Sequence, residues 1–280
     1  MDNKSQVNFL CYFCKQKTKN ELLCSECNKN PFIVEDARKL AASDKNRDIF
    51  KKLYEKKLKE IPNRNSGLFW NNHFKKELSF SDQDRMTKDK IYKIFSLLPQ
   101  TEGPFLDLGF GQGYLEELAK KKGKKINMFG LDISKTVVDR ARKKFKGHFV
   151  VGDILNMSRI FNKSKFDVIL AIEVLEHISP KKILIFLSDV NKSLNPHGIF
   201  LISTPLNEHL RKNKINLSGH VRDYSIDILK MELEISGFKI LEVHTFHAFK
   251  TFYTFKKLLA KIFTNRWEVN NVVIKAQKIK

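Results

Sequence analysis

The sequence predicts an α/β fold: a seven-stranded, mostly parallel sheet with helices on both faces, preceded by a small N-terminal zinc ribbon and a helical connector. Two observations carry this prediction. From residue 104 onward, short apolar segments alternate with helical patterns, which is typical of βαβ units. All four cysteines fall within the first 27 residues. The 280 residues therefore divide into a ribbon (1–30), a connector (31–84) and one domain of ordinary size (85–280).

The cysteine spacing predicts a structural zinc site. Its ligands would be two C-x2-C pairs separated by nine residues, namely Cys11, Cys14, Cys24 and Cys27. Two such pairs present four thiolates to one tetrahedral ion, and Zn²⁺ binds thiolates at about 2.3 Å. A site closed by four cysteines has no open position for a substrate, so the metal would supply folding energy to a very small module. Two redox pairs are the main alternative, although no thioredoxin-like strand and helix surround them.

The connector is predicted to be mostly helical. Its first helix ends at Pro62 and is indicated by apolar residues at helical spacing: Phe50, Leu53, Tyr54 and Leu58. The aromatic residues of the segment 67–80 follow no clean period, and packing onto the next domain is favoured over a lid across a substrate pocket. Another helix is predicted over 84–98, with one apolar face made of Ile91, Ile94, Phe95 and Leu98.

Seven strands are predicted in the domain. Five of them are Phe105–Leu108, Met128–Asp132, Phe149–Gly152, Val168–Ile172 and Ile199–Ser203. The helices between them begin near Tyr114, Lys135, Pro180 and Ser225. The late segments 239–246 and 270–278 are predicted to form an antiparallel pair that closes one edge of the sheet.

A glycine-rich turn follows the first strand and predicts a nucleoside-binding site. Gly109, Gly111 and Gly113 allow the tight turn and the close approach of a ligand to the backbone. The next strand ends in Asp132, where a carboxylate can accept hydrogen bonds from ribose hydroxyls. The G-x-G-x-G spacing and Asp107 beside it disfavour NAD, because a carboxylate would repel a pyrophosphate but suits the α-amino group of a methionine moiety.

The ordered set FLDLGFGQGYL, GLDIS, GDI, FDVILAIEVLEHI and NPHGIFLISTP resembles the class I S-adenosylmethionine-dependent methyltransferases of small-molecule type. The resemblance covers residues 85–280 and implies a Rossmann-like sheet with the cofactor at its carboxyl edge. Phe110 stands where this family usually has a small residue or cysteine. The cofactor-binding residues that the resemblance implies are Asp107, Gly109, Gly111 and Gly113 at the methionine end, Asp132 and Ile133 toward the ribose, Asp153 and Ile154 at the adenine, and Glu173 beside the sulfonium.

Catalytic candidates follow the fourth strand. Methyl transfer to a hydroxyl needs alignment and a base, and we expect His177, Glu173 and His220 to supply the catalytic groups. His177 is the favoured general base because histidine titrates near neutral pH, although it can equally be structural. Together with Glu176 these residues could bind one divalent ion. A similar E-x-x-E-H…H set occurs in the metal-dependent small-RNA 3′-terminal 2′-O-methyltransferases, and the set also resembles that of quinone-pathway O-methyltransferases.

The net charge of +21 first suggests an anionic partner such as nucleic acid. However, 42 of the 52 cations are Lys, whereas specific phosphate and base recognition favours Arg. The segment 246–267 combines aromatic residues with Lys and is interpreted as an amphipathic helix that contacts a membrane surface, packs on the core or forms a dimer contact. The chain shows no leader sequence and no spanning segment, so we expect a cytoplasmic protein that is able to sit on the inner membrane face.

These features together predict S-adenosylmethionine-dependent O-methylation of a small-molecule acceptor, such as a lipid- or glycan-linked precursor. An RNA 2′-O-methyltransferase that uses the ribbon and the basic surface is the first alternative. A non-catalytic, cofactor-binding scaffold is the second. The sequence alone does not choose the acceptor.

Overall fold

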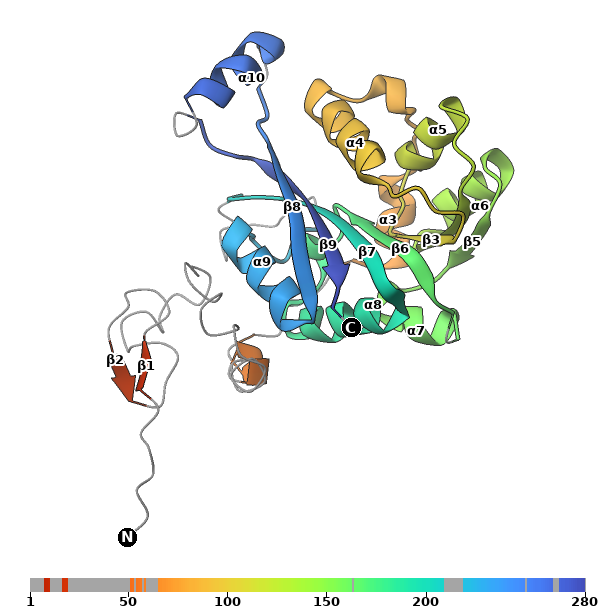
Figure 1. Ribbon diagram of the computed structural model, residues 1–280. Helices are drawn as coiled ribbons and strands as arrows, with labels where there is room; N and C mark the ends of the chain where they lie inside the picture. The colour runs from red at the N-terminus through yellow and green to blue at the C-terminus, as the bar shows by residue number, and fades with distance from the viewer. Residues whose placement is uncertain are drawn as a thin grey trace.

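Seven strands form one sheet in the order β5-β4-β3-β6-β7-β9-β8 (Figure 1). The first five are parallel, and β9 runs antiparallel to both β7 and β8. Their bounds are β3 Pro104–Leu108, β4 Asn127–Asp132, β5 His148–Val151, β6 Phe166–Ile172, β7 Leu194–Pro205, β8 Phe238–Phe246 and β9 Asn271–Lys278. The predicted α/β class, the seven strands and the antiparallel pair at the end of the chain are all confirmed.

This computed structural model describes residues 8–10, 17–19, 51–52, 54–56, 58, 65–162, 164–208, 219–249, 251–263 and 267–279. Near the N-terminus, β1 (Asn8–Leu10) pairs antiparallel with β2 (Lys17–Lys19). The zinc prediction concerns Cys11, Cys14, Cys24 and Cys27, all of which lie outside the described residues, so the zinc ribbon stays a prediction.

Helices cover both faces of the sheet (Figure 1). One face carries α4 (Arg85–Leu97), α5 (Tyr114–Lys121) and α6 (Lys135–Lys144). The other carries α7 (Met157–Ile160), α8 (Ile183–Ser193) and α9 (Ile226–Ile235). Neighbouring residues of a strand point to opposite faces. Phe105 therefore packs in the hydrophobic cluster under α4, α5 and α6, and Leu106 packs in the cluster under α7, α8 and α9. Burial on both faces explains why the parallel strands are almost continuously apolar.

Local signals determine the ends of α4. The side chain of Asp84 caps the helix by accepting a hydrogen bond from the Thr87 amide at 3.0 Å. Ile91 and Ile94 are buried against the sheet, and Leu98 ends the helix. The helix predicted over 84–98 is therefore confirmed. Its buried face also contains Lys90, a charged residue that the apolar pattern had left out.

The connector is described only in part. Residues 51–52 and 54–56 are helical, and Tyr54 and Leu58 pack against the core as predicted, whereas Phe50, Leu53 and Pro62 lie outside the described residues. The Tyr54 hydroxyl donates a hydrogen bond to Glu232 Oε1 at 2.6 Å, and Glu232 is paired with the buried Arg222. The hydrogen bond from Tyr54 to this buried ion pair therefore attaches this part of the connector to the domain.

Two short helices lie at the carboxyl edge of the parallel strands. The first is α3 (Gly67–His73), which is capped by Ser66 and packs against α6. The second is α10 (Tyr253–Ile262), which lies between β8 and β9 (Figure 1). It belongs to this edge because Asn271, where β9 begins, pairs with Pro205 at the carboxyl end of β7. Among the helices that the structure describes, none is long and apolar enough to cross a membrane.

Candidate active site

The glycine turn between β3 and α5 adopts a conformation that favours glycine at three positions. Gly109, Gly111 and Gly113 have φ angles of 66°, 53° and 73°. A Cβ on Gly109 would stand 2.9 Å from Val174, and one on Gly113 would stand 2.7 Å from the Phe145 ring. The turn therefore needs glycine for its backbone conformation and for its close packing, because any larger side chain would have to displace its neighbours.

Phe110 departs from the expected small residue, and the structure gives the reason that it fits. Its ring is buried and makes an edge contact with Phe149 at a centroid distance of 5.3 Å. Gly130 on the neighbouring strand β4 makes room for both rings, because a Cβ there would lie 2.9 Å from Phe110 and 2.5 Å from Phe149. Phe110 thus packs into the hydrophobic core.

Two carboxyl groups are buried around this turn, and three of their four oxygens lack a hydrogen-bond partner among the described residues. Asp107, near the end of β3, is 2% exposed and Glu116, in the first turn of α5, is 5% exposed. Asp107 Oδ1 and both carboxyl oxygens of Glu116 accept no hydrogen bond from the described residues. Burial, and then the neighbouring Glu116, raise the pKa of Asp107 well above its usual range, and burial raises the pKa of Glu116 to about 7. Such a pair is suited to a bound cation, which would offset both the burial of the carboxylates and their mutual repulsion.

Asp132 stands at the carboxyl end of β4, next to this pair. Its Oδ2 accepts a hydrogen bond from the Gly111 amide at 2.9 Å, and its Oδ1 accepts one from the Ser134 amide at 2.8 Å. Burial nevertheless raises the pKa of Asp132 to about 6. Each carboxylate oxygen keeps a second lone pair for a ligand hydroxyl. Ile133, also predicted to bind the cofactor, is half-buried, and its carbonyl oxygen lies close to Gly67 at the start of α3.

The predicted adenine contacts follow the adjacent strand β5. Asp153 Oδ1 accepts a hydrogen bond from the Leu155 amide at 2.9 Å, which caps a short 3₁₀ helix that begins at Ile154. Both side chains are half-buried. Because β5, β4, β3 and β6 are consecutive in the sheet, the structure brings Asp153, Asp132, the glycine turn and Glu173 to one edge, as predicted.

Glu173 follows β6 with a φ angle of 57° and is held as an anion. Its Oε1 lies 3.0 Å from the buried Lys90 Nζ and accepts a hydrogen bond from Ser203 Oγ at 2.7 Å. Asn271 Nδ2 donates to Glu173 Oε2 at 3.0 Å. Although burial acts to raise the pKa of Glu173, Lys90 and these hydrogen bonds lower it overall. Glu173 is therefore a fixed negative charge and a weak base.

The other predicted catalytic groups form a separate cluster. One ligand atom each from Glu176, His177 and His220 lie within 4.8 Å of one another, and the two imidazole rings meet edge to face at 4.8 Å. The structure thus brings together three of the four predicted metal-binding residues, while Glu173 is held elsewhere by Lys90. Glu176 is buried, with Oε2 accepting a hydrogen bond from Thr204 and Oε1 accepting none from the described residues.

The two histidines differ in their surroundings. Burial, and then the neighbouring His220, lower the pKa of His177 to about 4, so this imidazole is neutral at pH 7. His220 Nδ1 lies 2.6 Å from Glu208 Oε2. A carboxylate on Nδ1 selects the tautomer whose Nε2 is able to accept a proton. The Glu208–His220 pair is accordingly better arranged than His177 for base chemistry.

Helix α3 covers this edge from outside. Asn71 Oδ1 accepts hydrogen bonds from Ser134 Oγ at 2.9 Å and from the Thr136 amide at 3.1 Å. The Trp70 ring meets His177 edge to face at 4.9 Å. The Phe74 ring lies against Gly111, 3.4 Å from the point where a Cβ would stand. The aromatic segment therefore packs onto the domain, as favoured from the sequence, and does so over the glycine turn and the histidine cluster.

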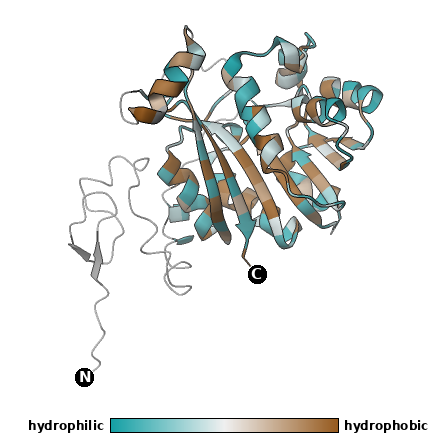
Figure 2. Cartoon of the chain, turned by 45° about the horizontal axis from the view of Figure 1, so that its top comes forward, coloured by the Kyte–Doolittle hydropathy of each residue, from teal (hydrophilic) through white to brown (hydrophobic). Residues whose placement is uncertain are grey.

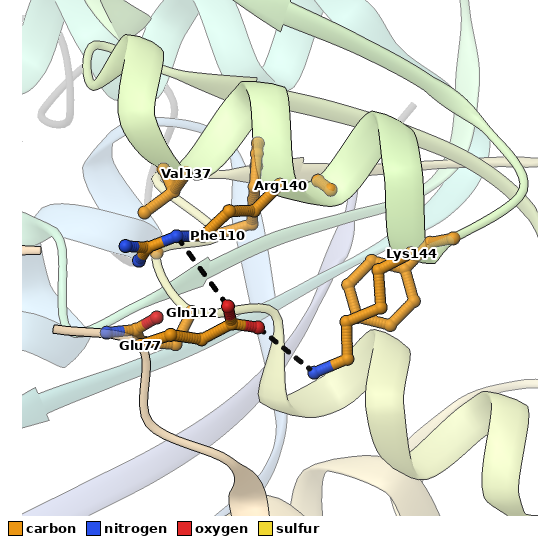
Figure 3. A pocket seen from close by; sticks show the side chains of 9 residues that line it. Glu77, Phe110, Gln112, Val137, Arg140 and Lys144 are labelled. Atoms are coloured by element: carbon orange, nitrogen blue, oxygen red, sulfur yellow. Dashed lines mark ion pairs between the residues drawn. The ribbon is translucent and has the colours of Figure 1, made fainter. Parts of the chain in front are cut away.

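A small pocket marks the outer side of the turn (Figure 3). It is lined by Glu77, Phe110, Gly111, Gln112, Val137, Arg140, Ala141, Lys144 and Phe145. Glu77 lies between two cations of α6, 3.8 Å from Arg140 Nε and 3.8 Å from Lys144 Nζ (Figure 3). Arg140 also donates hydrogen bonds to the carbonyl oxygens of Phe74 and Lys75. These contacts hold the segment after α3 on α6. The empty volume of about 240 Å³ is smaller than that of typical ligand pockets.

Comparison with known proteins agrees with this arrangement. Residues 105–198 match the family described as "Methyltransferase domain". The match covers about a third of the chain, so this region is similar to methyltransferase domains. A curated relative, the ubiquinone biosynthesis O-methyltransferase of Pelagibacter ubique, is 31% identical over 141 residues, which cover 48% of this chain and 57% of that protein. The chain spans about half the length of the curated relatives it matches.

Solved structures share the fold of this domain. An S-adenosylmethionine-dependent methyltransferase from Archaeoglobus fulgidus superposes with a TM-score of 0.55 at 18% identity, over 71% of this chain and 96% of that one. The N-methyltransferase NodS from Bradyrhizobium japonicum, in complex with S-adenosyl-L-homocysteine, gives 0.52 at 15% identity over 71% and 90%. The fold of this domain is thus the one found in S-adenosylmethionine-dependent methyltransferases of known structure.

Three residues of the site were missed by sequence reasoning. Lys90 and Glu116 lie on the buried faces of α4 and α5. A charge at an apolar position of a helical pattern was the signal that could have found them. Glu208 is different, because nothing in the order of residues links it to His220 before the chain is folded.

Proposed function

We propose that this protein transfers the methyl group of S-adenosylmethionine to an oxygen of a small-molecule acceptor. The observation that carries the proposal is the pair of buried carboxyls beside the glycine turn, Asp107 and Glu116. Asp107 Oδ1 and both carboxyl oxygens of Glu116 accept no hydrogen bond from the described residues. Few ligands other than a cation would suit this pair, and the methionine end of the cofactor carries an ammonium group. The O-methyltransferase relative supports oxygen as the acceptor atom only in general terms.

The residues present fit the cofactor part by part. Asp107 and Glu116 would hold the α-ammonium group, Asp132 would accept from the ribose hydroxyls through its remaining lone pairs, and Asp153 with Ile154 would contact the adenine. When bound, the cofactor supplies a methyl group on a positively charged sulfur. Glu173, kept anionic by Lys90, would place a fixed negative charge beside that position and so orient the cation.

The proposed base is His220, oriented by Glu208. A hydroxyl acceptor must lose its proton as its oxygen takes the methyl group, and His220 Nε2 would accept that proton. His177 lies next to His220 and is neutral at pH 7, so it would add no second positive charge when His220 becomes protonated. Methyl transfer also needs close alignment of the reacting atoms, and α3 provides an aromatic wall at this edge through Trp70 and Phe74.

A product search tests the proposed reaction. The full-length protein would be incubated with cell extract and cofactor carrying an isotopically labelled methyl group, and the small molecules would be analysed by mass spectrometry. We expect a labelled product that requires the protein and is lost in the His220→Asn variant. If the label enters RNA or protein instead, or if it enters no molecule while the cofactor binds, the proposed acceptor class is wrong.

The cluster of Glu176, His177 and His220 favours a second candidate, an RNA 2′-O-methyltransferase assisted by a divalent metal. Imidazole and carboxylate ligands this close together suit Mn²⁺, Fe²⁺ or Co²⁺. This candidate predicts metal-stimulated transfer to RNA and an RNA affinity that falls roughly linearly with the logarithm of the salt concentration. Binding of metal by calorimetry in the wild type but not in His220→Asn would support it.

We also propose that the N-terminal cysteines bind a structural zinc ion. The support is their spacing alone, because these residues lie outside the described part of the chain. Elemental analysis of the purified protein is expected to find one zinc per chain. The Cys24→Ser variant should contain much less zinc while still binding S-adenosylmethionine, and equal zinc content in both proteins would contradict the assignment.

A further inference from the structure

Helix α10 presents an apolar surface to solvent. Five large apolar side chains within 252–263 are exposed, namely Phe252 (77%), Phe255 (63%), Leu258 (58%), Ile262 (66%) and Phe263 (50%). They are five of the eleven exposed large apolar side chains in the described part of the chain. Lys256 and Lys257 on the same helix are half-buried, so they are less exposed than these apolar side chains. The helix therefore turns its large apolar side chains outward, and Figure 2 marks its hydrophobic residues in brown.

The inner side of α10 is attached to the domain, so this orientation is fixed. Tyr253, Lys257 and Ala260 recur at helical spacing and face inward; Tyr253 and Ala260 are buried. The Tyr253 hydroxyl donates a hydrogen bond to Asp89 Oδ2 on α4 at 2.8 Å, and Lys257 forms an ion pair with Asp89. Packing on the core thus accounts for one side of the helix and leaves Phe255, Leu258 and Ile262 unpartnered among the described residues.

Basic residues lie on α10 and on the neighbouring helix α4. Lys256 lies on α10 itself, and Arg85 and Lys93 stand four residues on either side of Asp89, on the side of α4 that meets α10. The whole chain carries a net charge of +21. Exposed aromatic and aliphatic side chains flanked by Lys and Arg match the polar–apolar boundary of a bilayer that contains anionic lipid.

The position of α10 links this surface to the candidate active site. The helix lies in the connection from β8 to β9, at the same edge of the sheet as the glycine turn. Asn271, where β9 begins, donates a hydrogen bond to Glu173. On α4, Asp89 binds α10 while the next residue, Lys90, binds Glu173. Helix α4 and the start of β9 therefore connect the apolar face of α10 to the candidate site.

We propose that α10 docks on an anionic phospholipid surface and that the acceptor is a lipid-linked molecule reached from that surface. The second part rests on the proposed methyl transfer, whereas the docking does not. The outward side chains would enter the boundary between headgroups and acyl chains, and Lys256, Arg85 and Lys93 would contact the headgroups. The carboxyl edge of the sheet would then lie close to the bilayer.

Vesicle co-sedimentation of the full-length protein tests the docking. We expect binding to vesicles of phosphatidylcholine mixed with phosphatidylglycerol and much weaker binding to phosphatidylcholine alone. Leu258→Ser should weaken binding about tenfold, since one fully buried leucine side chain corresponds to about that factor, and Lys256→Glu should weaken it on anionic vesicles. Ile185→Ser on α8 is the matched control, because Ile185 is similarly exposed at 56% and should leave binding unchanged.

Three results would overturn the docking. The first is equal partitioning of Leu258→Ser and wild type, and the second is no binding of the wild type to either vesicle. The third is a wild-type dimer by light scattering that Leu258→Ser converts to a monomer, which would make this face a contact between two copies of the chain. Binding of S-adenosylmethionine is measured on the same samples by calorimetry, so a failure of docking is separable from a failure of the proposed function.

Discussion

Lys90 Nζ lies 3.0 Å from Glu173 Oε1 and joins α4 to the carboxyl end of β6. The lysine side chain is only 4% exposed, while that of the glutamate is 36% exposed and reaches the candidate site. A lysine this deeply buried is costly unless it is paired. The pair therefore fixes the charge of Glu173 at the place where the cofactor sulfur is proposed to lie.

Removing one partner of this pair should destabilise the fold. Glu173→Gln would leave Lys90 buried without its counter-charge, and we expect the free energy of unfolding to fall by about 2–4 kcal/mol. Adding Lys90→Met to that variant should recover part of the loss, because the uncompensated charge is gone. Urea unfolding at pH 7 measures Glu173→Gln, Lys90→Met and the double variant. If the losses of the two single variants simply add, the two residues do not interact as described.

Glu116 should govern recognition of the methionine end. We expect Glu116→Gln to weaken binding of S-adenosylmethionine about 10-fold to 100-fold, since charge-assisted hydrogen bonds are worth about 1.5–3 kcal/mol. Binding of 5′-methylthioadenosine, which lacks the amino acid part, should not change. Calorimetry with both ligands separates the effects, and equal weakening of both would show that Glu116 is only structural.

Glu116 also predicts a pH dependence of stability without ligand. Its pKa rises from 4.5 to about 7 on folding, so its contribution to stability is complete below pH 4.5 and is lost as the pH rises through about 7. The difference in the free energy of unfolding between Glu116→Gln and wild type should therefore grow in favour of the variant from pH 5 to pH 8. A constant difference across this range would contradict the assigned burial.

His177 predicts the opposite trend at lower pH. Its pKa falls from 6.5 to about 4 on folding, so its contribution is complete above pH 6.5 and is lost as the pH falls through about 4. The loss approaches about 3 kcal/mol, since each pKa unit corresponds to 1.36 kcal/mol. His177→Asn should unfold with a weaker pH dependence between pH 6.5 and 4 than the wild type. Thermal unfolding across this range tests it, and identical pH profiles would contradict a buried neutral His177.

The Glu208–His220 pair should affect the chemical step. We expect His220→Asn to lower kcat by about 10²–10⁴, the usual contribution of a general base. Glu208→Gln, as a positioning change, should lower kcat less and leave KM and cofactor affinity near wild type. Glu242→Gln is the matched control, because Glu242 pairs with His244 at 2.9 Å on β8 and should not affect kcat. A change in KM alone for Glu208→Gln would contradict the role.

The fold followed from the sequence because each strand is a short apolar run. Burial on both faces requires such runs. Asp132 is the last residue of β4, and Asp153 follows shortly after the end of β5. The length of β7 was underestimated, since the structure starts this strand at Leu194 instead of Ile199. Pro196 and Gly198 hid the first pairing, which joins Leu194 to Phe166.

The site was predictable only where its residues are close in sequence. The glycine turn and Glu173 to His177 are local motifs. The contacts of Lys90 with Glu173 and of Glu208 with His220 depend on tertiary structure, and no local sequence pattern predicts them. The position of α3 was likewise hidden, because the aromatic residues of this segment divide their contacts among Gly111, His177 and Gly219 instead of lining one helical face.

Titration of the purified full-length protein with S-adenosylmethionine tests the central claim most directly. We predict saturable binding at one site per chain by calorimetry at pH 7.5. Asp107→Asn, which removes the charge beneath the glycine turn, should weaken that binding at least tenfold. Absence of binding by the wild type, or full binding by Asp107→Asn, would contradict the account.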